Sequence, residues 1–296
     1  MIKVTFLGTS GSAPTSERNL PSVALEYNGE VFLFDCGEGT QRQVLKYTVN
    51  LSKTKAIFLS HIHGDHSIGV AGVVRTLALN RRSAQLQIFA PKGDEKAIKP
   101  LLEFDKAVMS YDISVKPITT GTIYEGKGFK ISAFKLTHSV RAYGFVFRED
   151  DKIHFLKEKA KAAGLKGQMF SNLVKSGRMT VNGKVVKLKD LTTKEPGKIV
   201  VYSTDTRPSK EIISASKGAD LLIYESTYAN SESKLAVERK HSTAEEGAEV
   251  AKKAKAKKLV LTHISTRYKN TSALLNEAKK KFGNVELAKD GLALTI

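Results

Sequence analysis

The sequence predicts an α/β fold in which loops at one edge of a β-sheet collect polar side chains. Short apolar runs typical of buried strands recur along the 296 residues, and four of them end just before a His or an Asp. Amphipathic segments of helical length lie at 242–258 and 268–281. Hydrophobic residues make up 41% of the chain, enough for one large domain or two smaller ones.

The expected strands are short and rich in β-branched or aromatic residues, which favours strands over helices of the same length. The helix at 242–258 carries a run of lysines at its end, where positive charge complements the helix dipole. The helix at 268–281 is expected to end at Gly283. The strands are expected at 2–7, 56–59, 129–136, 198–202 and 258–261.

The most specific feature is the sequence His-Ile-His-Gly-Asp-His at 61–66, directly after a short apolar strand. Side chains two apart on an extended backbone point the same way, so His61 and His63 can bind one ion. Once the glycine has turned the chain, Asp65 and His66 are placed to reach a second ion. Nitrogen and carboxylate ligands without thiolate suit zinc in a catalytic site. The alternative is a solvated histidine-rich loop, but only seven histidines occur in the chain and three fall here.

Three further candidate ligands also stand just after expected strands: His138, Asp205 and His263. Loops at one edge of a sheet are where α/β folds bring together residues from distant parts of the chain. Each residue alone has a simpler interpretation. A single histidine at a strand end is more often a hydrogen-bonded core residue, and Asp205 can cap a helix. Together with the 61–66 cluster, the pattern favours metal ligands.

Short motifs spread along nearly the whole chain accompany these candidates. They are Phe6-Leu-Gly-Thr9, Pro14-Thr-Ser-Glu-Arg18-Asn19, Asp35-Cys-Gly-Glu-Gly-Thr-Gln41, Ser203-Thr-Asp205-Thr206, Glu225-Ser-Thr227, His241-Ser-Thr243 and His263-Ile-Ser-Thr-Arg267-Tyr268. The 61–66 segment is similar to the metal-binding loop of the metallo-β-lactamase superfamily. The Phe-Leu-Gly-Thr, Asp-Cys-Gly-Glu-Gly-Thr-Gln and His-Ser-Thr segments resemble more closely one of its families, ribonuclease Z, the tRNA 3′-end endonucleases.

The resemblance implies the four-layer αββα sandwich of that superfamily, with two zinc ions per subunit in a dinuclear site. Two such metals stabilise the attacking and the leaving oxygens of a phosphoryl displacement, and they lower the pKa of a bound water. By resemblance, one zinc would be held by His61, His63 and His138, the other by Asp65, His66 and His263, and Asp205 would bridge the two.

The same resemblance implies three catalytic roles. Asp65 would orient the attacking water and accept its proton, and His241 would give a proton to the leaving 3′-oxygen. Glu225 would hold the tautomer and the charge of His241. The residues leave simpler interpretations open: Glu225 as a strand-end carboxylate in an ordinary ion pair, and His241 as a helix-start residue. Ser242 and Thr243 after it look like cap positions.

The charge of the chain favours a polyanionic partner. Forty-eight Lys and Arg against thirty Asp and Glu give a net charge of +18. Residues 152–198 contain twelve of the basic and three of the acidic residues, so half of the excess lies in about a sixth of the chain. Lys and Arg neutralise phosphates and release counterions, which favours a nucleic acid. The alternative is a lysine-rich surface without a specific partner.

The segment 150–198 interrupts the alternation of strands and helices. A helix is expected at 151–163, with Phe155 on its apolar side, and the glycines that follow should end it. The dipeptide Asn182-Gly183 between two short apolar segments predicts a hairpin. This segment resembles the insertion of ribonuclease Z proteins, which implies a basic arm, or exosite, that holds the tRNA away from the cleavage site. A basic linker or a dimer arm is the alternative.

The expected organisation is therefore a catalytic domain formed by 1–149 and 199–296, with the basic arm at 150–198 inserted into it. His154 of the arm is not expected to bind metal. Three residues in segments that resemble substrate-facing loops are expected to contact phosphate, although a plain surface role is equally open for them. The expected substrate contacts are Arg18, Ser265 and Arg267 and, in the arm, Lys152, Lys157, Lys161, Lys166 and Arg178.

Three functions compete. The resemblance implies a zinc-dependent endoribonuclease that removes the 3′ trailer from precursor tRNA, leaving a 3′-hydroxyl on the tRNA and a 5′-phosphate on the trailer. The alternative is a small-molecule hydrolase of the same fold, a phosphodiesterase or thioesterase, but a basic arm has no obvious use for a small ester. A non-catalytic RNA-binding protein is disfavoured by the complete set of candidate ligands.

Composition and the family resemblance indicate the compartment and the oligomeric state. The one cysteine, Cys36, excludes a disulfide framework and fits a reducing compartment, so a cytoplasmic location is expected. No apolar run approaches the roughly eighteen residues that a membrane span needs, and no signal peptide is visible. The resemblance implies a homodimer in which the arm of one subunit serves the active site of the other.

Overall fold

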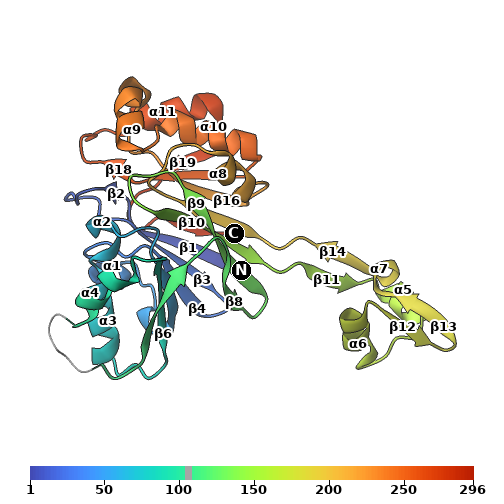
Figure 1. Cartoon of the computed structure of the whole chain (residues 1–296). Coiled ribbons are helices and arrows are strands. Elements are labelled where there is room, and N and C mark those ends of the chain that lie inside the picture. Colours follow the sequence, from blue (N-terminus) through green and yellow to red (C-terminus); the bar gives the residue numbers. More distant parts are fainter. Residues whose placement is uncertain (104–108) are drawn as a thin grey trace. The chain divides into compact units, whose positions relative to one another are not determined.

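Two seven-stranded β-sheets organise the chain in the computed structural model, which describes residues 1–103 and 109–296 (Figure 1). The strands of the first sheet, in spatial order, are β20 (Ala293–Thr295), β1 (Ile2–Gly8), β3 (Ser22–Tyr27), β4 (Glu30–Phe34), β5 (Thr54–Phe58), β6 (Leu86–Pro91) and β7 (Ile113–Ile118). Those of the second are β19 (Val285–Leu287), β17 (Leu259–Thr262), β16 (Leu221–Glu225), β15 (Ile199–Ser203), β10 (Ala142–Glu149), β9 (Phe129–Leu136) and β8 (Gly121–Gly126).

An aromatic core joins the two sheets. The ring of Phe34 on β4 lies 5.5 Å from the ring of Phe145 on β10 and 5.7 Å from that of Tyr202 on β15, centroid to centroid. All three side chains are fully buried, and Phe58 of β5 packs beside them. Full burial of one such side chain contributes roughly 1.5–3 kcal/mol, so the inward faces of the strands hold the sheets together.

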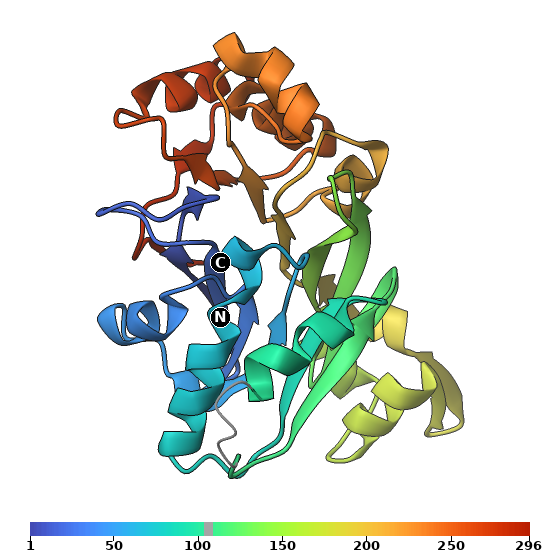
Figure 2. The same cartoon turned by 60° about the vertical axis from the view of Figure 1, so that its left-hand side comes forward.

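Helices cover the outer face of each sheet and complete four layers in the order αββα (Figures 1 and 2). The predicted four-layer sandwich is confirmed. The helices on the first sheet are α1 (Thr40–Lys46) and α3 (Val70–Leu79), and those on the second are α8 (Lys210–Ala215), α10 (Ala244–Ala254) and α11 (Ser272–Lys281).

Shorter elements connect these layers. Within the described part of the chain, no helix combines the length and the apolar character needed to cross a membrane. The short elements are β2 (Ser10–Gly11), η1 (Leu51–Lys53), α2 (Gly64–Ser67), η2 (Glu95–Ala97), α4 (Lys99–Glu103), η3 (Asn230–Glu232), α9 (Ser233–Arg239) and β18 (Ile264–Ser265).

Two predicted helices are present, but each begins or ends at other residues than predicted. α10 begins after Thr243, whose hydroxyl accepts a hydrogen bond from the Glu246 amide while the Glu246 carboxylate accepts one from the Thr243 amide. It ends before Lys255, whose left-handed backbone (φ 53°) stops the helix short of its predicted end. α11 begins only at Ser272, because a turn precedes it in which the Asn270 side chain accepts from the Ser272 amide.

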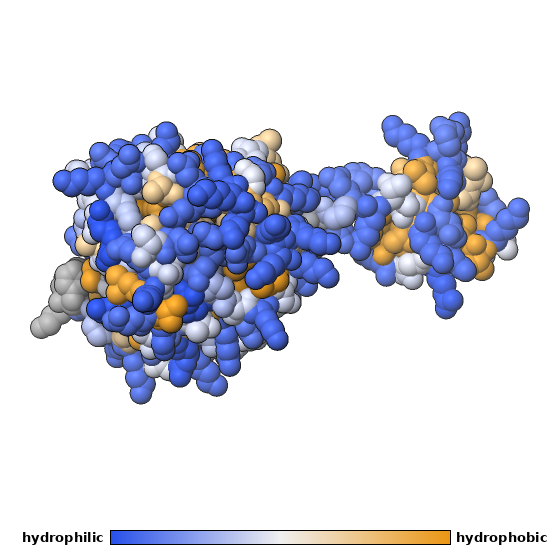
Figure 3. All heavy atoms as spheres, turned by 90° about the horizontal axis from the view of Figure 1, so that it is seen from above, coloured by the Kyte–Doolittle hydropathy of each residue, from blue (hydrophilic) through white to orange (hydrophobic). Residues whose placement is uncertain are grey.

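Residues Arg148–Lys198 form a second compact unit. This unit has a small core of its own, made of Ala160, Leu165, Leu173 and Leu191. Figure 3 shows hydrophobic side chains in small groups among the hydrophilic ones that dominate its surface. The elements of the unit are β11 (Lys152–Phe155), α5 (Lys157–Ala162), α6 (Met169–Ser176), β12 (Arg178–Val181), β13 (Lys184–Lys187), α7 (Leu188–Leu191) and β14 (Thr192–Glu195).

The predicted helix at 151–163 is wrong in its first half. Lys152–Phe155 is instead a strand, paired antiparallel with Thr192–Glu195. That partner lies far along the chain, so pairing between distant segments overrides the local helical pattern. The predicted hairpin is confirmed, because Asn182 and Gly183 both have positive φ (49° and 76°), as a type I′ turn requires.

Candidate metal centre

The ends of strands from both sheets deliver the predicted ligands. β15, β16 and β17 pair in parallel, so their carboxyl ends meet at one edge of the second sheet. Asp205 follows β15, and His263 follows β17. His138 comes after β9 of the same sheet, and the 61–66 loop comes after β5 of the first sheet. Four segments that are distant in sequence thus converge.

The side chains form overlapping groups, one of which is Asp205, His241 and His263, and Asp205 lies between the two groups that correspond to the predicted ligand sets. Its Oδ2 is 3.7 Å from Nε2 of His61, whereas its Oδ1 is 3.1 Å from Nε2 of His263. One carboxylate therefore turns an oxygen toward each group, as a bridging ligand would. The first group is His61, His63, His138 and Asp205, the second is Asp65, His66 and His263, and within each group the donor atoms lie within 4.8 Å of one another.

A buried carboxylate behind the ligands was missed by the sequence reasoning. Asp35 accepts hydrogen bonds from Nδ1 of His66 at 2.7 Å and from the hydroxyl of Tyr202 at 2.7 Å. It also accepts from the Ser60 hydroxyl at 2.9 Å, so that hydroxyl is left to accept from Nδ1 of His61, 2.9 Å away. Asp35 thereby fixes the orientation of two candidate ligands. Its position directly after an apolar strand was the available signal.

The other histidines are oriented by different partners. Nδ1 of His138 donates to the backbone carbonyl of Lys240 at 3.2 Å, and Nδ1 of His263 lies 2.9 Å from the hydroxyl of Thr227. Both residues therefore present Nε2 to the ligand groups. His63 is turned the other way, with its Nδ1 facing its group at 3.4 Å from Nε2 of His138.

These residues fit two cations. Nε2 of His66 and Nε2 of His263 are buried, and neither has a hydrogen-bond partner among the described residues. A buried polar atom without a partner costs about 1–3 kcal/mol, and a cation between these nitrogens and the carboxylates would satisfy it. Burial alone would raise the pKa of Asp65 and of Asp205, but the neighbouring histidines bring both well below the ordinary range. Ionised carboxylates, with imidazole nitrogens that a cation would bind in place of their protons, are a donor set that suits zinc.

A histidine–carboxylate pair lies beside the two groups. Glu225, the last residue of β16, is buried, and its Oε1 accepts from Nδ1 of His241 at 3.1 Å and from the Thr206 amide at 2.5 Å. Burial lowers the pKa of His241, but the charge of Glu225 outweighs burial and raises it to about 9. His241 is therefore protonated at neutral pH, and Nε2 is the nitrogen left to give up a proton.

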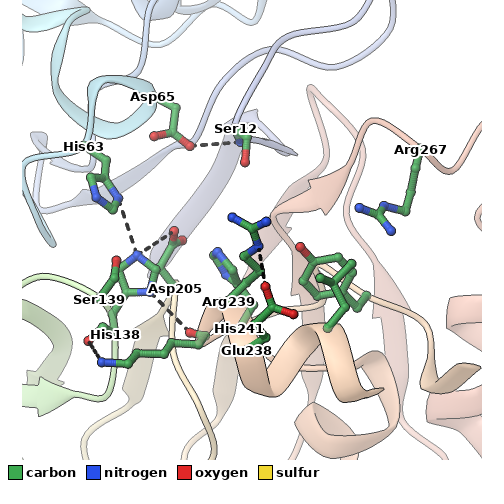
Figure 4. A pocket seen from close by; sticks show the side chains of 13 residues that line it. Ser12, His63, Asp65, His138, Ser139, Asp205, Glu238, Arg239, His241 and Arg267 are labelled. Carbon is green, nitrogen blue, oxygen red and sulfur yellow. Dashed lines mark hydrogen bonds and ion pairs between the residues drawn. The ribbon is translucent and has the colours of Figure 1, made fainter. Parts of the chain in front are cut away.

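A cleft of about 610 Å³ opens over these side chains (Figure 4). His63, Asp65 and His241 line it together with basic residues at the end of α9, Arg239 and Lys240. Glu238 also lines the cleft, with its Oε1 3.6 Å from Nε of Arg239. The positive charge of Arg239 and Lys240 beside the candidate ligands suits an anionic substrate such as a phosphodiester. The sequence reasoning did not single out these two basic residues, because nothing local distinguishes them from other surface charges.

The predicted substrate residues fall in different places. Nη1 of Arg18 donates to the hydroxyl of Thr9 at 2.7 Å and to the carbonyl of Ala288 at 2.7 Å, which gives this side chain a structural task. Arg267 lines the cleft, and Ser265 accepts a hydrogen bond from it at 3.2 Å. Their contacts with substrate stay predictions. The five predicted arm residues, Lys152, Lys157, Lys161, Lys166 and Arg178, are all exposed.

Comparison with known proteins places this arrangement in a family. A model of the anti-Pycsar protein Apyc1 family matches residues 2–173, and one of the β-lactamase superfamily domain matches 159–264. Human tRNase Z, short form, has a similar structure, with a TM-score of 0.73 at 26% identity over 99% of both chains. The metallo-β-lactamase fold protein YhfI of Bacillus subtilis, at 22% identity and a TM-score of 0.69 over 99% of this chain and 98% of its own, shares the fold.

Relatives in sequence match from end to end. Ribonuclease Z of Archaeoglobus fulgidus is 39% identical over 100% of this chain and 98% of its own length. Ribonuclease Z of Methanothermobacter thermautotrophicus is also 39% identical, over 100% and 97%. Identity at this level along the full length, on the metallo-β-lactamase fold, means that the chain belongs to the ribonuclease Z family.

Proposed function

We propose that the chain is an endoribonuclease that removes the 3′ trailer from precursor tRNA. The observation that carries this proposal is the position of Asp205, which turns one oxygen to each of two groups of candidate metal ligands beside the Glu225–His241 pair. Hydrolysis of a phosphodiester needs what this arrangement offers: a place for the attacking water and an acid for the leaving oxygen. Family membership supplies the substrate class.

Two zinc ions per subunit are the proposed cofactor. His61, His63 and His138 would hold one ion, and Asp65, His66 and His263 the other, with Asp205 shared. When bound, the pair would lower the pKa of a water and neutralise charge on the phosphate. Ligand chemistry supports zinc, because imidazole and carboxylate ligands without thiolate are typical of its catalytic sites.

Asp65 is proposed to orient the water and accept its proton. Its Oδ2 accepts a hydrogen bond from the backbone amide of Ser12 at 2.9 Å, and its side chain lines the cleft (Figure 4). With Oδ2 held by this amide, Oδ1 is available to a water molecule. The water oxygen attacks the phosphorus of the trailer's first phosphate, and its proton goes to the carboxylate.

His241 is proposed to protonate the leaving group. The 3′-oxygen of a ribose is a poor leaving group, so its departure needs a proton. Nδ1 of His241 is held by Glu225, and Nε2 can give its proton to this oxygen as the bond from phosphorus breaks. The tRNA then ends in a 3′-hydroxyl and the trailer begins with a 5′-phosphate.

The basic arm (150–198) is proposed to hold the tRNA. Twelve basic against three acidic residues lie between 152 and 198, and the five predicted contact residues are exposed. Such a charged, separately folded unit supports a nucleic-acid partner over a small ester, so the small-molecule hydrolase is the weaker proposal. The ends of the arm adjoin each other, because the Glu149 amide donates to the Lys198 carbonyl at 2.9 Å.

A homodimer and a cytoplasmic location complete the proposal. Leu45 on α1 and Leu79 on α3 are 71% and 82% exposed, and helices α1 and α3 contact each other. Exposed leucines on adjoining helices support a surface for a second copy. Cys36 is buried and unpaired, which supports a reducing compartment.

The test is cleavage of a precursor tRNA with a 3′ trailer by the wild type, by Asp65→Ala and by a chain in which a short turn replaces 152–196. The proposal expects one cut next to the acceptor stem, loss of that cut in Asp65→Ala and weaker binding without the arm. If the wild type leaves the RNA intact yet hydrolyses bis(p-nitrophenyl) phosphate, the metal site is active and the substrate assignment is wrong.

A further inference from the structure

One buried hydroxyl touches both parts of the catalytic site. Thr227 is only 3% exposed. Its Oγ1 lies 2.5 Å from Oε2 of Glu225 and 2.9 Å from Nδ1 of His263. Glu225 belongs to the histidine–carboxylate pair, and His263 belongs to the second ligand group.

The chemistry of these three groups allows one arrangement of protons. An ionised carboxylate can only accept hydrogen bonds, so the Thr227 hydroxyl donates its single proton to Glu225. The hydroxyl then has only lone pairs left for His263, whose Nδ1 must carry the proton and donate it. His263 is thereby fixed as the tautomer whose Nε2 lone pair faces the ligand group.

The two oxygens of the Glu225 carboxylate have different hydrogen-bond partners. Oε2 is occupied by the hydroxyl and, at 3.4 Å, by the amide of Thr227, whereas Oε1 receives His241 and the Thr206 amide. Without the hydroxyl, Glu225 would have no short hydrogen bond on Oε2 and could rotate away from His241.

The other candidate ligands are oriented without this link. Nδ1 of His66 is held by Asp35 and that of His138 by the carbonyl of Lys240, and neither partner is hydrogen-bonded to Glu225. We propose that Thr227 is a positioning residue that ties the metal ligand His263 to the Glu225–His241 acid pair. This inference rests on the proposed function for the role of His241, but not for the role of His263.

Two substitutions separate the hydroxyl from the methyl group. Thr227→Val keeps the shape and removes the hydroxyl, and Thr227→Ser keeps the hydroxyl. Thr5→Val is a matched control, because Thr5 is equally buried and its hydroxyl has no hydrogen-bond partner among the described residues. If Thr227→Val does not fold, Thr227→Ala removes the same hydroxyl with less steric demand and carries the same expectation.

The first measurement is zinc affinity by competition with a chromophoric chelator. Thr227→Val should bind the zinc of the second ligand group, which contains His263, about 10–100-fold less tightly, the usual effect of losing a residue that orients a ligand. Thr227→Ser and Thr5→Val should stay close to the wild type. Equal affinity in wild type and Thr227→Val overturns the inference, and so does an equal loss in Thr227→Val and Thr227→Ser, which would indicate packing alone.

The second measurement compares two leaving groups at saturating zinc. p-Nitrophenolate leaves without a proton, whereas the 3′-oxygen of tRNA needs one. Thr227→Val should therefore lose kcat for precursor tRNA by about 10–100-fold and keep most of its kcat for bis(p-nitrophenyl) phosphate. An equal loss for both substrates overturns the link to His241. If the wild type does not cleave tRNA at all while the zinc affinities differ as expected, the proposed function fails and the link to His263 stands.

Discussion

Oε1 of Glu225 lies 3.1 Å from Nδ1 of His241, in a site where the carboxylate is fully buried and the imidazole faces the cleft. The Thr206 amide donates to the same oxygen, so Glu225 is held in place before any substrate arrives. A buried negative charge next to an imidazole stabilises its protonated form. This contact makes His241 a stronger candidate for the acid than a histidine at a helix start would otherwise be.

The pH profile of tRNA cleavage should therefore have a basic limb near pH 9. The pKa of His241 is raised to about 9 in the folded protein, so its proton is present at neutral pH and is lost as the pH rises through 9. Glu225→Gln should move this limb toward the ordinary histidine pKa of about 6.5. The measurement is kcat against pH for both proteins, with bis(p-nitrophenyl) phosphate as a substrate that should not show the limb. An unchanged limb in Glu225→Gln would contradict the assignment.

Asp65→Asn should lower kcat for precursor tRNA by about 10²–10⁴-fold at saturating zinc, the usual contribution of a group that handles a proton. The amide keeps the shape but cannot accept the water's proton. Asp112→Asn, a change at an exposed aspartate outside the cleft, is the control and should leave kcat unchanged. Cleavage by Asp65→Asn at the wild-type rate would exclude Asp65 as the proton acceptor.

Two histidines, His138 and His154, should respond differently to alanine substitution. His138→Ala removes a member of the first ligand group, so the zinc content after dialysis should fall by about one ion per chain. His154 lies in the Arg148–Lys198 unit, where its Nε2 is 3.0 Å from Oε2 of Glu195. His154→Ala should therefore keep the wild-type zinc content. Metal analysis by mass spectrometry decides, and full zinc content in His138→Ala would remove this residue from the ligand set.

Asp35→Asn should weaken both metal binding and the fold. Four donors converge on the carboxylate, namely Nδ1 of His66, the hydroxyl of Tyr202, and both the hydroxyl and the amide of Ser60. An amide can accept fewer of them and brings donors of its own. Zinc affinity should fall about 10–100-fold, and the free energy of unfolding should fall by about 1–3 kcal/mol. Tyr202→Phe removes one donor and leaves the carboxylate, so it should lower both the zinc affinity and the free energy of unfolding by less than Asp35→Asn does. The reverse order would show that the carboxylate is not the organising group.

Reversing charges on the arm should weaken tRNA binding without slowing the chemistry. Lys157→Glu with Lys161→Glu should raise KM for precursor tRNA and make binding less dependent on salt, by roughly one unit of slope for each phosphate that is no longer neutralised. The control is Lys252→Glu with Lys255→Glu at the exposed end of α10. Equal effects of the two pairs would mean that net charge, rather than the arm, sets affinity.

The ligand positions could be predicted because their signals are local. Spacing within 61–66 and the place of His263 after a strand are visible in a few residues, and the structure brings these side chains together. Asp35 escaped notice because its partners, His66 and Tyr202, lie 31 and 167 positions away. The helix predicted at 151–163 was misplaced for the same reason, because contacts with a distant segment decide its first half.

Lys152–Phe155 pairs with Thr192–Glu195, and that distant pairing decides the conformation of a segment whose own residues favour a helix. Contacts between distant segments also set the role of Thr227, whose hydroxyl serves His263. Local pattern therefore predicted the candidate ligands that the structure brings together, whereas the residues that orient them became visible only in the folded chain.

The order of the ligands along the chain constrains when the site can form. His61 follows a strand of the first sheet, whereas His263 follows β17, one of the last strands of the second sheet. The first strand, β1, pairs with the last, β20, and Lys3 lies opposite Thr295. A chain still being translated lacks His263, and its first strand lacks one neighbour, until both sheets have been made. The candidate ligand groups that contain His263 are therefore incomplete until the last strands of both sheets have been made.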